Sequence, residues 1–184
     1  MNFFEIVGAR YSHKERFLPN PVPLADLEQI AKTGIAAPSG ANRQTVQLII
    51  LPDREGVLNA ISALTPYHSG LATAPAAIAV FTDTTLTASS EPFNFEKEDY
   101  SAAVENMLLA ATALDYASLW LDHPYFDADT ANKASKLMGV PDSFKLWAIL
   151  PVGKPDGEGS RREKLPYEAR VSYCKYVDNS TANG

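Results

Sequence analysis

Apolar residues recur along the chain with two periods, which separate the expected helices from the expected strands. Leu27, Ile30, Ala31 and Gly34 fall at helical spacing and predict a helix over 24–36, which ends before Pro38 because the residue before a proline avoids the helical region. Other helices are expected over residues 2–9, 55–64 and 127–137. Continuous apolar runs typical of buried strands cover residues 46–51, 76–81 and 147–152. Shorter or edge strands are expected at 118–121 and 171–177, and a surface loop over 82–93.

The longest expected helix, residues 96–116, is apolar around almost its whole circumference. Such a helix has to be buried on nearly all sides. Two arrangements satisfy this: packing on a partner chain, or a central position within its own subunit. If the helix forms a dimer core, Leu108→Glu should give monomeric or insoluble protein.

Length and composition restrict the class of protein. The 184 residues fit a single domain over 1–184, with about 172–184 as a C-terminal arm or tail. A net charge of −6 disfavours nucleic acid as a partner. No apolar run reaches the roughly 18 residues of a membrane span, and the first residues do not resemble a signal peptide, so we expect a cytoplasmic protein. The single cysteine, Cys174, cannot form an internal disulfide.

Two basic clusters stand out at opposite ends of the chain. Arg10, Ser12 and Lys14 alternate, so an extended backbone would present all three on one face. Arg162 and Lys164 alternate in the same way. If the fold brings the clusters together, four positive charges converge on one point and suit a phosphate monoester. If it does not, they are two solvated surface patches.

The loop over 38–44 is the other candidate for binding. Ser39, Asn42 and Gln44 could form hydrogen bonds with a polyol or the edge of a heterocycle, or could simply serve the turn. The sequence has no glycine-rich dinucleotide motif, no Walker loop, no metal-ligand spacing among its histidines and no nucleophile elbow. Hydrolase and metalloenzyme functions are therefore disfavoured, and no metal is expected.

Six segments, in order along the chain, resemble motifs of the nitroreductase family of flavoproteins. Residues 10–14 resemble its R-x-S-x-R/K motif and residues 37–44 its A-P-S-x-x-N-x-Q loop. Residues 99–111 resemble its D-x-x-x-A-x-x-N-x-L-L-A-A helix, and 117–121 the strand after it. The closing G-x-P and basic-x-basic-x-P elements correspond to residues 152–155 and 162–166.

The resemblance implies an α+β fold: an α/β sandwich in which helices flank a central, mostly antiparallel sheet, assembled as an intertwined homodimer. It implies an FMN-dependent oxidoreductase that passes electrons from NADH or NADPH to a small oxidised acceptor, such as a nitroaromatic or a quinone, by a ping-pong mechanism. It also implies which residues contact FMN. Its phosphate and ribityl chain would be bound by Arg10, Tyr11, Ser12, Lys14, Arg162 and Lys164. The flavin would be lined by Pro38, Ser39, Asn42 and Gln44 of the neighbouring subunit, and by Leu121, Asp122 and His123.

The chain departs from the family pattern at three places. Thr45-Val46 replaces the usual Pro-Trp, Asp115-Tyr116-Ala117 replaces Gly-x-Gly, and His123 replaces a common glycine. We assign no catalytic residue; Tyr67, His68 and His123 are candidates for substrate contact. The alternatives are a reductive dehalogenase, whose charged lid the segment 65–73 is too short and uncharged to supply, a non-catalytic FMN-binding or sensory protein, and a plain interaction domain.

Overall fold

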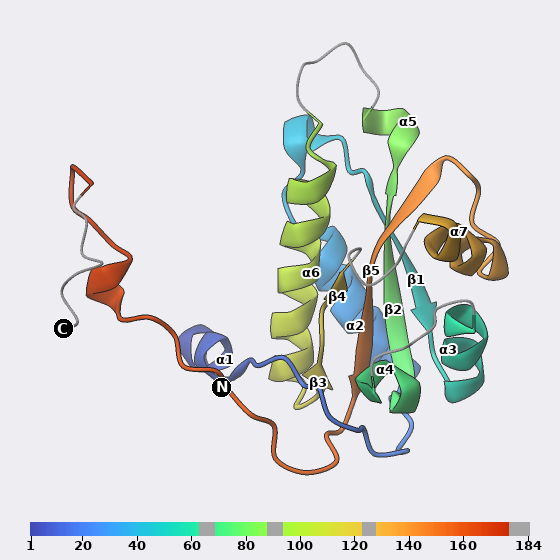
Figure 1. The fold of residues 1–184 in the computed structure, drawn as a ribbon, viewed down its shortest axis with the longest axis horizontal. Helices are drawn as coiled ribbons and strands as arrows, with labels where there is room; N and C mark the ends of the chain where they lie inside the picture. Colours follow the sequence, from blue (N-terminus) through green and yellow to red (C-terminus); the bar gives the residue numbers. More distant parts are fainter. Residues whose placement is uncertain (63–68, 88–93, 123–127, 177–184) are drawn as a thin grey trace.

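An antiparallel sheet organises the molecule, whose computed structural model describes residues 1–62, 69–87, 94–122 and 128–176 (Figure 1). Its three long strands are β1 (Val46–Leu51), β2 (Ala76–Asp83) and β5 (Phe144–Gly153), in that spatial order. Two short strands, β3 (Ala117–Ser118) and β4 (Leu121–Asp122), both pair with the far edge of β5. Each of these strand pairs is antiparallel. Among the described residues β1 pairs with β2 alone, so it is an edge strand.

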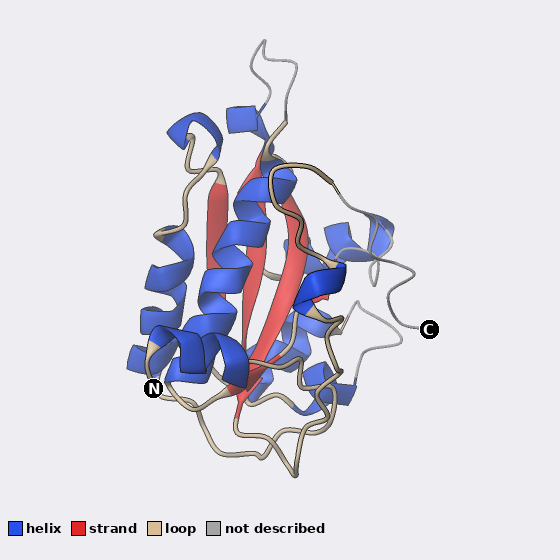
Figure 2. Cartoon of the chain, turned by 90° about the vertical axis from the view of Figure 1, so that its left-hand side faces the viewer, coloured by secondary structure: helices blue, strands red, loops and turns tan. Residues whose placement is uncertain are grey.

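Helices cover both faces of the sheet (Figure 2). The central strands β2 and β5 are therefore buried on both sides along most of their length. Successive residues of β2 alternate between two cores: Ala77, Ala79 and Phe81 face one side, while Ile78 and Val80 face the other. The first core is covered by α3 (Arg54–Ile61) and α7 (Ala128–Leu137), with the short α4 (Ser69–Thr73). The second is covered by α2 (Leu24–Ile35) and α6 (Glu96–Ala113). The expected α+β sandwich is confirmed.

The long helix α6 divides into two faces. Tyr100, Val104, Met107 and Leu108 are buried against the sheet and α2. The opposite side is less covered: Leu109 is half-buried and Ala113 is exposed. The helix is therefore central on one face within its own subunit, whereas the other face is not fully covered by this chain.

Three sequence predictions differ from the structure. The loop expected over 82–93 begins later, because β2 continues to Asp83 and is followed by the short helix α5 (Thr84–Thr87). The strand expected over 118–121 is split into β3 and β4, since Leu119 and Trp120 leave the ladder between them. Residues 171–176 are irregular, with a bend over 173–175, rather than an edge strand, because no strand among the described residues pairs with them.

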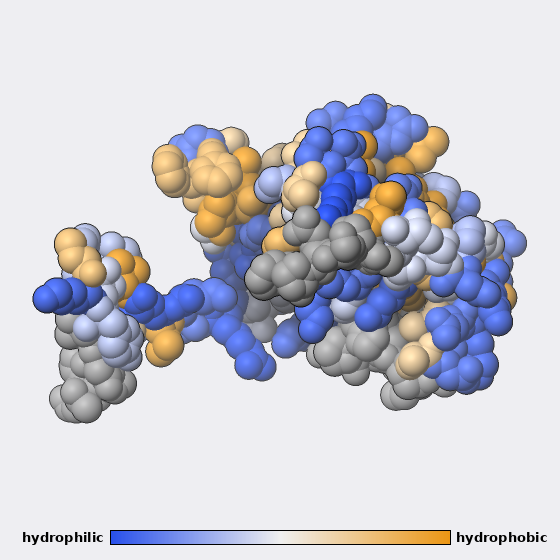
Figure 3. Space-filling model, turned by 90° about the horizontal axis from the view of Figure 1, so that it is seen from above, coloured by the Kyte–Doolittle hydropathy of each residue, from blue (hydrophilic) through white to orange (hydrophobic). Residues whose placement is uncertain are grey.

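The N-terminal helix lies beside the first part of the C-terminal segment (Figure 1). The helix α1 (Phe3–Ala9) begins at Asn2, whose side chain accepts from the Glu5 amide while the Glu5 carboxylate accepts from the Asn2 amide. The C-terminal segment passes α1 and continues away from the body of the molecule, where it forms the short helix η3 (Tyr167–Ala169) (Figure 1). Seen from above, exposed apolar side chains gather on α1 and recur on this segment (Figure 3). None of the helices in the described part of the chain is long and apolar enough to cross a membrane.

Candidate functional site: a basic pocket and a strained loop

The two basic clusters of the sequence line one pocket. This basic pocket has a volume of about 410 Å³. Its lining combines α1, the segment that follows it and the C-terminal segment: Val7, Gly8, Arg10, Tyr11, Ser12, Lys14, Ser160, Arg161, Arg162 and Lys164. The convergence that the sequence left open is therefore present: the two clusters form one basic surface rather than two.

Backbone alternation places the N-terminal cluster. Ser12 forms a bridge with Ser118 of β3, and the His13 amide donates to the Ser118 carbonyl at 3.0 Å. The His13 ring points away from the pocket into the protein, where it is fully buried and packs edge-on against Phe17 with ring centroids 4.7 Å apart. Arg10, Ser12 and Lys14 all face the pocket, as the period of two predicts.

Arg161 links the C-terminal segment, on one side of the basic pocket, to α1 on the other side by hydrogen bonds. Its two terminal nitrogens donate to the carbonyls of Gly8 and Ala9 at 2.9 and 2.7 Å, at the C-terminal end of α1. Gly159 lies so close to the Tyr11 ring that a Cβ would overlap it. Sequence reasoning assigned no role to either residue; the position of Arg161 beside Arg162 was a signal, whereas nothing local marks Gly159.

The charges of the basic pocket suit a small, doubly charged anion. Arg10, Lys14, Arg162 and Lys164 supply four cations and Ser12 a hydroxyl. Arg10 is partly engaged already, because its Nε lies 3.6 Å from Glu105 Oε1 of α6. A phosphate monoester carries nearly two negative charges and three acceptor oxygens, so this donor set fits the phosphate end of FMN.

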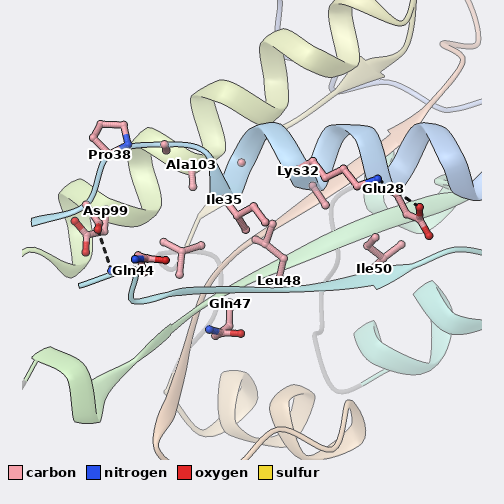
Figure 4. A pocket seen from close by; sticks show the side chains of 15 residues that line it. Glu28, Lys32, Ile35, Pro38, Gln44, Gln47, Leu48, Ile50, Asp99 and Ala103 are labelled. Carbon is pink, nitrogen blue, oxygen red and sulfur yellow. Dashed lines mark hydrogen bonds and ion pairs between the residues drawn. The ribbon is translucent and has the colours of Figure 1, made fainter. Parts of the chain in front are cut away.

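A second pocket, of about 500 Å³, lies between α2 and the edge strand β1 (Figure 4). We call it the loop pocket, because Pro38, Ser39 and Gln44 of the loop 38–44 are among its lining residues. Asn42 of the same loop is exposed and does not line it. The basic pocket and the loop pocket share no lining residue, so one chain does not bring the two predicted sets of flavin contacts together.

The loop is attached to α6 through Asp99. Asp99 Oδ1 accepts from the Gly40 amide and Oδ2 from the Thr45 hydroxyl, each at 2.7 Å. Within the loop the Gln44 amide donates to Ser39 Oγ at 2.9 Å. Asp99 is 3% exposed, so both hydrogen bonds are shielded from water. The sequence did not predict this network.

Two residues of the third predicted set of flavin contacts, Leu121 and Asp122, form β4. The Leu121 side chain is buried in the core, so only its backbone is available to a ligand. Asp122 accepts from the Tyr100 hydroxyl at 3.1 Å, and Tyr100 stacks on Trp147 at 4.8 Å between ring centroids. Burial, and then the charge of Asp122 and the hydrogen bond to it, raise the pKa of Tyr100 to about 12. The hydroxyl is therefore neutral at physiological pH. His123, Tyr67 and His68 lie outside the described residues.

A basic pocket whose donors suit a phosphate group lies on a helix-flanked antiparallel sheet. The sequence profile of the nitroreductase family matches residues 7–65 and 57–154, which together span most of the chain. The chain therefore belongs to the nitroreductase family and is an oxidoreductase of that type. Within its described residues, no three His, Cys, Asp or Glu side chains are grouped to hold a metal ion.

Relatives and solved structures agree with this assignment. A protein of Archaeoglobus fulgidus with the provisional name NADH dehydrogenase/NAD(P)H nitroreductase is 35% identical over 133 residues, which cover 72% of this chain and 74% of that protein. A crystal structure of a nitroreductase family protein from Clostridium difficile is 29% identical, with a TM-score of 0.77 over 96% of this chain and 100% of that one. A provisionally named nitroreductase from Desulfovibrio desulfuricans, solved in complex with FMN, has a TM-score of 0.76 at 24% identity, over 96% of this chain and 99% of that one.

Proposed function

We propose that the protein is an FMN-dependent oxidoreductase that passes electrons from NADH or NADPH to a small oxidised acceptor, such as a nitroaromatic or a quinone. The basic pocket carries the proposal, because Arg10, Lys14, Arg162 and Lys164, with the Ser12 hydroxyl, match a phosphate monoester in a chain of the nitroreductase family. The FMN bound to the Desulfovibrio desulfuricans protein supports the choice of cofactor.

The chain's own residues would bind and orient the cofactor. Arg10, Lys14, Arg162 and Lys164 would neutralise the phosphate, and Ser12 would donate to it. Tyr11 would contribute its backbone near the ribityl chain, and Leu121 and Asp122 would line the flavin, Leu121 through its backbone. When bound, FMN supplies the exchange of a hydride or of two electrons, while the protein supplies position and charge. Because donor and acceptor would use the same site in turn, we expect ping-pong kinetics.

We also propose that the active unit is an intertwined homodimer. The loop pocket and the basic pocket are separate within one chain, so a site containing both needs a second subunit. The outer face of α6 carries a half-buried Leu109. The C-terminal segment beyond Lys164 exposes Leu165, Tyr167, Tyr173 and Tyr176. These apolar surfaces would be buried by a partner subunit. The cytoplasmic location stays a prediction from the sequence.

The first experiment is the visible absorption spectrum of the freshly purified protein, before and after anaerobic addition of NADH or NADPH. We expect flavin bands that bleach when the nicotinamide is added. Yellow protein that neither nicotinamide bleaches would contradict the proposed electron donor and favour a non-catalytic flavin-binding protein. Colourless protein that FMN cannot reconstitute would exclude the proposal altogether.

A further inference from the structure

The loop 38–44 has a backbone that its own residues do not favour. Ala41, Asn42 and Gln44 have φ values of 51°, 55° and 52°, in the left-handed region. This region is costly for residues with a Cβ and is least unfavourable for asparagine. Strained backbone of this kind persists only where surrounding contacts hold it, and it is concentrated at ligand sites. The contacts that hold this loop are therefore relevant to its function.

Asp99 supplies contacts at both ends of the strained segment. Its two carboxylate oxygens accept from Gly40 and Thr45, one each, at 2.7 Å. Gly40 is held on its other side by Phe95, because a Cβ at position 40 would overlap the Phe95 ring. The first turn of α6 thus fixes the start and the end of the segment through one buried carboxylate.

The attachment through Thr45 uses a residue at which this chain departs from the family pattern that it resembles. The sequence resembles nitroreductases that usually carry Pro-Trp after the loop glutamine, whereas this chain has Thr45-Val46. Proline has no hydroxyl and could not donate to Asp99. Thr45 is 1% exposed, so its hydrogen bond to the carboxylate is not exchanged with water. A buried acceptor that loses its donor is costly to leave unpaired.

We propose that Asp99 and Thr45 are positioning residues of the flavin site: they hold the loop 38–44, before the cofactor binds, in the conformation that lines the flavin of the neighbouring subunit. The inference rests on the proposed function. Holding the loop in place beforehand removes its ordering from the free-energy cost of binding. Loss of the Thr45 hydroxyl should therefore weaken FMN binding although Thr45 itself does not touch the cofactor.

The test compares three variants by titrating FMN into the apoprotein. Thr45→Val preserves the shape of the side chain and removes the donor, so we expect roughly tenfold weaker binding. Thr45→Ser keeps the hydroxyl and should bind FMN within about threefold of the wild type. Val57→Ala is the control for general destabilisation, because Val57 is fully buried in the core on the other face of the sheet. It should lower the melting temperature and leave FMN affinity unchanged.

Amide hydrogen exchange of the apoprotein gives a measurement that does not depend on FMN. Thr45→Val should speed exchange at Gly40 and Gln44, whose amides the loop contacts protect, whereas Val57→Ala should not do so selectively. Equal FMN affinity of Thr45→Val and wild type would overturn the inference, as would equal weakening by Val57→Ala or failure of Thr45→Ser to restore binding. A wild type that does not bind FMN would instead remove the proposed function.

Discussion

The cations of the basic pocket come from single residues at opposite ends of the sequence, and their contributions can be separated by substitution. We expect Arg10→Ala/Lys14→Ala to lower FMN affinity by about 3 kcal/mol, or roughly a hundredfold, because two hydrogen bonds to a charged phosphate are lost. Flavin content per chain, measured from the absorption spectrum after purification, reports the change.

The matched control is Lys133→Ala/Lys136→Ala, which removes the same charge from the exposed surface of α7. Salt bridges at such positions contribute little to stability, so flavin content should not change. Full flavin occupancy in the Arg10/Lys14 variant would falsify the assignment of the phosphate site.

Asp115 stands where the resembled family pattern has a glycine, and the surrounding contacts hold it in a backbone conformation typical of glycine. The resemblance places a glycine here, and Asp115 has φ 62°, a conformation that glycine adopts more easily. Lys154 Nζ compensates by donating to the Asp115 carbonyl at 2.5 Å and to its carboxylate at 2.8 Å. The substitution is therefore tolerated within the chain's own contacts, and it does not alter the basic pocket, whose lining excludes Asp115.

The neighbouring Tyr116 gives a prediction about pH. Burial raises the pKa of Tyr116 from 10.0 to about 12, helped by the hydrogen bond from its hydroxyl to Asp26 at 2.7 Å and by the charge of Asp26. The unfolded chain ionises this tyrosine first, so its contribution to stability is complete below about pH 10 and is lost as the pH rises towards 12. Tyr116→Phe should lower the free energy of unfolding by about 1 kcal/mol at pH 8.

The difference between wild type and Tyr116→Phe should become smaller at pH 11, because only the wild type has this ionisation to lose. Denaturant unfolding at the two pH values measures it. The pKa of Tyr100 is raised as well, but Tyr100 is present in both proteins, so its contribution cancels from the difference in unfolding free energy. A difference that is the same at pH 8 and pH 11 would contradict the raised pKa of Tyr116.

At the scale of elements, the two faces of α6 change how a dimer interface should be tested. Sequence alone suggested Leu108→Glu, but Leu108 is only 3% exposed and packs in its own subunit's core, so that variant would unfold the subunit. Leu109 is half-buried on the other face. We expect Leu109→Glu to give a folded monomer, because the charge is left in water when the partner is absent.

Light scattering gives the mass and circular dichroism the fold of both α6 variants. Leu109→Glu should retain the wild-type helical signal, and Leu108→Glu should lose much of it. A dimer of Leu109→Glu that forms as tightly as the wild type would exclude this face of α6 from the interface.

Helices and strands could be predicted from the sequence where their buried faces produce a regular spacing of apolar residues. The strands β1, β2 and β5 and the helices α2 and α6 were predicted because apolar runs and helical spacing follow directly from the faces they bury. The segment 171–177 was predicted as a strand from composition, but a strand also needs a neighbour to pair with, and the described part of the chain places none beside residues 171–176.

The candidate site was predictable only in part, for a related reason. Alternation placed Arg10, Ser12 and Lys14 on one face, and family resemblance related them to Arg162 and Lys164. The Asp99 network joins α6 to residues 59 and 54 positions away. No local pattern marks such contacts, because they depend on how the elements pack.

At the scale of the whole molecule, the C-terminal segment extends away from the body and exposes apolar side chains (Figure 1). We expect deletion of residues 165–184 to leave a folded monomer that retains the lining of the basic pocket, since Arg162 and Lys164 remain. The wild type should unfold at a temperature that rises with protein concentration, as a dimer does, whereas the truncated chain should not show this dependence.

Thermal unfolding at several protein concentrations, together with sedimentation, measures both properties of the truncated chain. A truncated protein that dimerises as strongly as the full chain would remove the C-terminal segment from the interface. One that fails to fold would show that this segment supports its own subunit.

The contacts of Arg161 with Gly8 and Ala9 also determine when, during synthesis, the basic pocket can be completed. These residues are separated by 153 and 152 positions, so the first part of the pocket leaves the ribosome long before the last. The strands of the sheet and the helices that cover it end at Gly153, so a chain that stops soon after this residue contains all of them. A nascent or prematurely terminated chain would thus carry an almost complete domain with half of its anion site. Loading with a phosphorylated ligand would then distinguish finished chains from unfinished ones.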